Sequence, residues 1–155
     1  MGVRKSSAVR IFAAAAAAGI LIFAVYLFVG NPSVWYHNQS LKKAVCGIAA
    51  GAEQKETVTL NEIVPFSWDK VYTFEPYTGR EEIEKTIGFP SSSIRETVNE
   101  GMVQLLFVKG KKVTASVCGY PQSLGYDVVF NGDIAYADKA EFHAVRQSGI
   151  VRLTR

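Results

Sequence analysis

The side chains that could act in catalysis are few and lie far apart in the sequence. A hydrolase needs a nucleophile or an activated water molecule with a base within reach. The groups available for these roles are Asp69, Glu75, Cys118, His143 and scattered serines. No G-x-S-x-G, H-E-x-x-H or catalytic-cysteine signature accompanies them. We therefore expect no catalytic residue and no cofactor, and we keep an extracytoplasmic hydrolase as the alternative.

The two cysteines, Cys46 and Cys118, leave two interpretations open. In an oxidising compartment they could form a disulfide, and a bridge that closes a loop of about seventy residues stabilises by roughly 4 kcal/mol. Two buried free thiols are the other interpretation, which we slightly favour. No C-x-x-C pair exists, and neither His37 nor His143 neighbours another ligand, so we expect no metal site.

Aromatic residues are the better candidates for a binding role, because Trp and Tyr dominate the energetic centres of interfaces. Residues 66–77, with the sequence FSWDKVYTFEPY, predict a strand that Pro76 ends. The period of two places Trp68, Tyr72 and Phe74 on one side of it. Most of these rings are equally expected in a core. The candidate contacts are Trp68, Tyr72, Phe74 and Tyr77, with Tyr120 and Tyr126 in addition.

An uncharged apolar stretch, residues 11–30, is long enough to cross a membrane. Twenty helical residues span roughly 30 Å, the thickness of a hydrocarbon core. Ten of them are Leu, Ile, Phe or Val, which favour insertion by about 3–6 kcal/mol. A cleaved signal has a shorter apolar core and a small-x-small cleavage site, whereas this segment ends in Leu27, Phe28 and Val29. We therefore expect an uncleaved signal-anchor helix in the lipid bilayer.

The basic residues Arg4, Lys5 and Arg10 precede the span, and residues 31–40 after it carry no charge. The positive-inside rule then predicts a cytoplasmic tail, 1–10, a span, 11–30, a linker, 31–39, and an extracytoplasmic domain, 40–155. Of the 17 basic residues, 14 lie beyond the span and match the 14 acidic residues. A formally neutral domain argues against a nucleic-acid partner, because phosphate binding requires a basic surplus.

Periodicity and turn residues divide the domain into elements. Helices are predicted over 41–50, with Ser40 as cap and Gly51 at the end, and over the region 78–87, where Thr78 and Glu81 have capping-box spacing. Gly88 and Pro90 end the second helix. Strands are expected at 56–60, 66–75, 102–108, 112–118, 126–130, 142–147 and 150–154. The fold class is α+β: one N-terminal transmembrane helix, then one small antiparallel-sheet domain of five to seven strands with one or two helices packed on it.

Two stretches, FSWDKVYTFEPYTGREEIEKTIGF and ETVNEGMVQLLFVKGKKV, resemble a family of small bacterial membrane-anchored or lipid-anchored extracytoplasmic proteins. The similarity covers residues 58–120 and consists of a tryptophan-aspartate-lysine strand, an acidic helix and a hydrophobic hairpin. It implies a bacterial extracytoplasmic domain. Since the family has no established activity, the resemblance assigns no site residue.

A small anchored domain without a catalytic set predicts a non-catalytic interaction module that binds an envelope or secreted protein. A further alternative to the hydrolase is a subunit of a membrane complex that assembles through its transmembrane helix. Residues 13–19 offer the small side chains that allow close helix approach.

Overall fold

The computed structural model describes residues 7–29, 31–48 and 56–155, with side chains described for residues 10–24 of the first range. The chain divides into two compact units, Met1–Pro32 and Ser33–Arg155. The first unit contains helix α1, Ser7–Val29, in which an alanine run of high helix propensity is continued by apolar residues. Within the described residues, no helix combines the length and the hydropathy that a membrane crossing requires.

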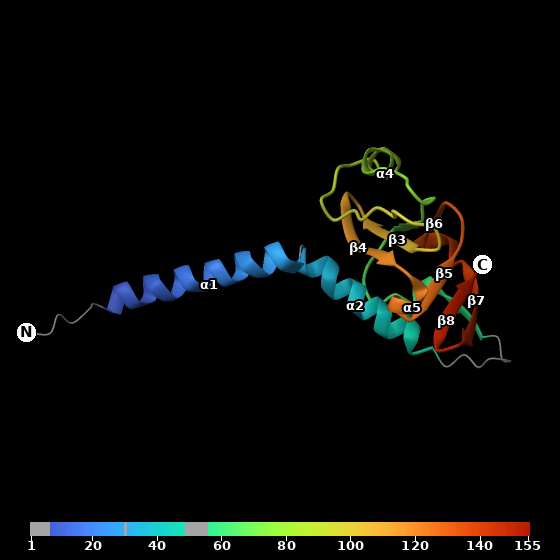
Figure 1. Ribbon diagram of the computed structural model, residues 1–155, viewed down its shortest axis with the longest axis horizontal. Coiled ribbons are helices and arrows are strands. Elements are labelled where there is room, and N and C mark those ends of the chain that lie inside the picture. Colours follow the sequence, from blue (N-terminus) through green and yellow to red (C-terminus); the bar gives the residue numbers. More distant parts are fainter. Residues whose placement is uncertain (1–6, 30, 49–55) are drawn as a thin grey trace, which may run out of the picture. The chain divides into compact units, whose positions relative to one another are not determined.

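The second unit is an α+β domain with two four-stranded sheets (Figure 1). The first sheet has the order β1, Glu56–Thr59; β7, Glu141–Gln147; β8, Ile150–Thr154; and β5, Tyr126–Val129. The second has the order β4, Lys112–Gly119; β3, Val103–Lys109; β2, Lys70–Tyr72; and β6, Asp133–Ala135. All pairs are antiparallel except β5 with β8, which are parallel. The α+β class is confirmed, but the expectation of a single antiparallel sheet is wrong.

Four α-helices and one 3₁₀ turn accompany the strands within the described residues from Pro32 onward. They are α2, Pro32–Cys46; α3, Leu60–Ile63; α4, Arg80–Ile87; α5, Pro121–Leu124; and the turn η1, Tyr136–Asp138. In Figure 1, α4 lies on one side of the β3–β4 sheet, and β7 and β8 lie on the other.

Two apolar clusters occupy the two faces of the β3–β4 sheet. The larger cluster joins this sheet to the β7–β8 sheet and to α2, and it includes Leu41, Phe107 and Phe142. The smaller one lies under α4, where Ile83 packs with Leu106. β3 therefore buries both of its faces, which matches its largely apolar sequence.

Residues 32–39 are not the linker that the sequence predicted, because α2 begins at Pro32. The helix lies along the outer edge of β4. His37 Nδ1 donates to Thr114 O at 2.7 Å, and the Asn38 amide donates to Ser116 O at 2.8 Å and accepts from Ser116 N at 3.0 Å. These side chains satisfy a strand edge that would otherwise be open. The helix ends at Cys46, before the predicted end, and Gly51 lies outside the described residues.

The strands expected at 102–108 and 112–118, and at 142–147 and 150–154, are confirmed and pair as two hairpins. β3 pairs with β4 across Gly110, which has φ +56°, and β7 pairs with β8 across Ser148 and Gly149, with φ +51° and +81°. Two consecutive residues with positive φ are the signature of a type I′ turn, which matches the twist of paired strands. Sequence alternation and turn glycines are local signals, and here they suffice.

Two local predictions near residue 70 are wrong. The strand expected over 66–75 is only Lys70–Tyr72, because the chain bends at Asp69 and leaves the sheet after Tyr72. The capping box of Thr78 and Glu81 is absent: the N-cap of α4 is Gly79, and Thr78 Oγ1 donates to Glu75 O instead. The predicted C-cap, Gly88, is confirmed with φ +85°.

Candidate binding cleft

A cleft of about 550 Å³ opens where β2 leaves β3. β2 pairs with β3 only from Lys70, opposite Val108, to Tyr72, opposite Leu106. The next residues turn toward the β5–β6 connection, where Thr73 N donates to Gly132 O at 2.9 Å. Residues 103–105 of β3 therefore have no β2 residue paired with them, and the cleft lies on this side of β3.

Three segments from distant parts of the sequence line the cleft. Residues 73–75 and 78, with Glu82 and Thr86 of α4, form one wall. Residues 101–104, at the start of β3, and residues 127–132, in β5 and the following turn, form the others. The cleft therefore depends on the tertiary arrangement of the domain.

The charged side chains of the lining are all acidic. Glu75, Glu82 and Asp127 contribute carboxylates, and the lining holds no Lys, Arg or His. Gln104 is 5% exposed; its Nε2 donates to Arg95 O at 2.8 Å, whereas Oε1 has no hydrogen-bond partner. A buried acceptor without a donor costs about 1–3 kcal/mol. The lining therefore combines three carboxylates and no basic side chain with threonine and amide groups that can both donate and accept.

Tyr77 lies between the lining residues Glu75 and Thr78 and has an unusual backbone. Its φ is +68°, in the left-handed region that residues with a Cβ rarely adopt. The conformation is held by Tyr77 N donating to Thr97 O at 3.0 Å, while the side chain is 66% exposed. Strained backbone that presents an exposed aromatic ring is typical of a functional surface.

The four predicted binding aromatics occupy three different environments. Trp68 is 2% exposed and packs edge-to-face on Phe107, so it belongs to the core. Tyr72 and Phe74 stack with ring centroids 6.1 Å apart and pack against the smaller cluster. Phe74 also lines the cleft, whereas Tyr77 is exposed on the segment between the lining residues Glu75 and Thr78 and is not itself part of the lining. Of the four, Phe74 lines the cleft and Tyr77 has the most exposed ring.

The groups considered for hydrolysis are not assembled into a site. Asp69 accepts hydrogen bonds from Lys109 Nζ at 2.6 Å and from Gly110 N at 2.8 Å, and these bonds lower the pKa of its carboxyl. His143 is exposed on β7, and Glu75 lines the cleft. In the described part of the chain, no hydrogen bond or ion pair joins any two of Asp69, Glu75, Cys118 and His143.

Both cysteines are free thiols in the structure. Cys46 Sγ lies 3.6 Å from Gly125 O, and Cys118 Sγ lies 3.5 Å from Glu96 O. Burial raises the pKa of the Cys118 thiol, which keeps it protonated and weakly nucleophilic near neutral pH. Among residues 10–24, 31–48 and 56–155, no group of three or more His, Cys, Asp or Glu side chains could hold a metal ion.

Comparison with protein-family models, curated proteins and solved structures finds no match to this chain. The site therefore rests on its own geometry.

Sequence reasoning missed Glu82, Thr86, Gln104 and residues 127–132 as parts of one site. One local signal was present: Gln104 is the single polar residue in the apolar run 102–108. A polar side chain in a strand that buries both faces needs hydrogen-bond partners. Gln104 was therefore a candidate site residue that the sequence could have indicated. No local signal could place β5 beside it.

Proposed function

We propose that this protein is a single-pass, membrane-anchored, non-catalytic binding module, with a cytoplasmic N-terminus and an extracytoplasmic α+β domain. The anchor is residues 11–30, and the support for it is the sequence: twenty uncharged residues after three basic ones. The resemblance of residues 58–120 to bacterial envelope proteins is consistent with this location.

The binding function is assigned to the cleft between β3, β5 and α4. The observation that carries it is the cleft of about 550 Å³, one wall of which includes Glu75 and Thr78, the residues on either side of the exposed, left-handed Tyr77 segment. Pockets with a few convergent polar groups are the default ligand sites of proteins. The partner is an envelope or secreted protein.

A photo-crosslinking amino acid tests this assignment in the full chain in its native membrane. At position 77 the group replaces an exposed ring, so folding is preserved; at position 143 it replaces exposed His143 on another sheet. We expect a discrete crosslinked product from position 77 and none of the same mass from position 143. Equal products from both positions, or none from 77, would contradict the assignment.

A further inference from the structure

The cleft has an uncompensated negative charge. Asp127 is paired with Arg152, whose Nε lies 3.1 Å from Asp127 Oδ2. Glu75 and Glu82 are exposed and form no ion pair with any described residue. With no basic residue in the lining, the two carboxylates attract a cation.

Hydrogen-bond chemistry in the cleft favours the same kind of ligand. The exposed carboxylates of Glu75 and Glu82 only accept hydrogen bonds, and the buried Gln104 Oε1 is an acceptor without a donor. Ammonium and guanidinium groups only donate. The charge and the acceptor character of the two free carboxylates therefore both favour a lysine or arginine side chain.

Two strand edges meet in the cleft. Residues 103–105 of β3 have no β2 partner, because that pairing stops at Leu106. β5 is the last strand of its sheet, so its side away from β8 has no strand partner among the described residues. Open strand edges bind extended peptides through main-chain hydrogen bonds.

Resting on the proposed binding function, we infer that the cleft recognises an extended peptide segment of its partner through a lysine or arginine side chain. The cation lies between Glu75 and Glu82, and the peptide main chain follows the open strand edges. The carboxylates provide the specificity for charge, and the edges provide the preference for an extended polypeptide.

Fluorescence anisotropy of a labelled, end-capped hexapeptide of alternating alanine and arginine tests the inference on the full chain in uncharged detergent. Three competitors are compared: the unlabelled peptide, the same peptide with glutamine for arginine, and free spermidine. We expect the arginine peptide to compete at least about fivefold better than the glutamine peptide, and better than spermidine. Its affinity falls as salt is raised.

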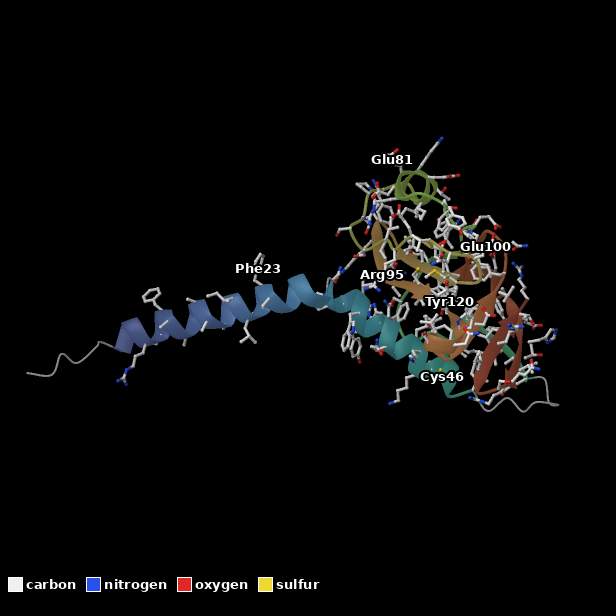
Figure 2. The ribbon with its side chains drawn as sticks, in the orientation of Figure 1. Phe23, Cys46, Glu81, Arg95, Glu100 and Tyr120 are labelled. Carbon is white, nitrogen blue, oxygen red and sulfur yellow. The ribbon has the colours of Figure 1, made fainter. Side chains whose placement is uncertain are left out.

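A charge-matched pair of variants localises the effect. Glu75→Gln with Glu82→Gln removes both cleft carboxylates and is expected to weaken binding at least about fivefold. Glu81→Gln with Glu141→Gln removes the same net charge at two exposed positions outside the lining. Figure 2 shows Glu81 on the outer side of α4. This control should bind as the parent does; equal weakening in both variants would overturn the inference.

The remaining outcomes separate the inference from the proposed function. If the glutamine peptide or spermidine competes as well as the arginine peptide, the cationic-peptide inference is wrong. If no peptide binds but position 77 still crosslinks in the membrane, the cleft remains the binding site and its ligand is of another class. If both experiments fail, the proposed function fails with the inference.

Discussion

At the scale of single residues, the backbone geometry between residues 66 and 77 decides which apolar cluster each aromatic side chain enters. Trp68 precedes the bend at Asp69 and enters the larger cluster, whereas Tyr72 follows it and faces the smaller one. The assumption of an unbroken strand therefore put Trp68 on the wrong face. Tyr77 alone among the four candidates is exposed, and its backbone is in the left-handed region.

Replacing Tyr77 with glycine tests whether its ring contributes to the stability of the fold. Glycine adopts φ +68° without strain, so we expect Tyr77→Gly to keep its stability or gain up to about 1 kcal/mol. The control is Tyr120→Gly, where φ is −76° and glycine costs about 0.5–1 kcal/mol. Urea unfolding followed by tryptophan fluorescence measures both. A clear loss of stability in Tyr77→Gly would show that the ring is structural.

Asp69 gives the domain a stability that depends on pH. Hydrogen bonds from Lys109 and Gly110 lower the folded-state pKa of this carboxyl below the ordinary value of 3.8. A depressed pKa stabilises the folded state above the unfolded-state pKa and loses that effect as pH falls through the folded-state pKa. We expect Asp69→Asn to unfold at lower urea than the parent at pH 7, and the difference to shrink below about pH 4. A difference that is constant from pH 7 to pH 3 would contradict this role.

At the scale of elements, local signals located the hairpins but not α2 or the cleft. Alternation and turn glycines identified β3–β4 and β7–β8, and Gly88 identified the end of α4. Residues 32–39 have no clear apolar stripe; in the structure Val34 packs in the smaller cluster, and His37 and Asn38 bond to the edge of β4. The three-residue strand β6 is likewise defined by its pairing with β2. Such elements depend on tertiary contacts, which periodicity cannot reveal.

A substitution at Asn38 tests whether the hydrogen bonds from α2 to the edge of β4 stabilise the fold. Asn38→Ala leaves Ser116 N and O without their partners, and we expect a loss of about 1–3 kcal/mol in the free energy of unfolding. The exposed neighbour Gln39→Ala on α2 is the matched control and should change stability by less than about 0.5 kcal/mol. Chemical denaturation of both variants gives the comparison. If they lose equal stability, the edge contacts are not what holds α2 in place.

At the scale of the whole molecule, the net charge belongs to the tail before the proposed anchor, and the domain beyond it is neutral. Two arginines, Ile20→Arg with Phe23→Arg, test the anchor. Each arginine near the centre of a span costs about 2.5–3.5 kcal/mol, which together outweighs most or all of the favourable insertion energy. We expect this variant to leave the membrane fraction in alkaline carbonate, whereas Ile20→Leu with Phe23→Leu stays. Retention of the arginine variant would contradict the anchor.

The central claim is that the cleft between β3, β5 and α4 holds the partner. The most direct measurement is the yield of the crosslinked product from position 77 when the cleft is filled. Thr86→Trp places a large ring in the lining, and Lys85→Trp places the same ring on α4 outside it. The proposed site predicts that Thr86→Trp abolishes the product and Lys85→Trp preserves it; an undiminished product from Thr86→Trp would contradict it.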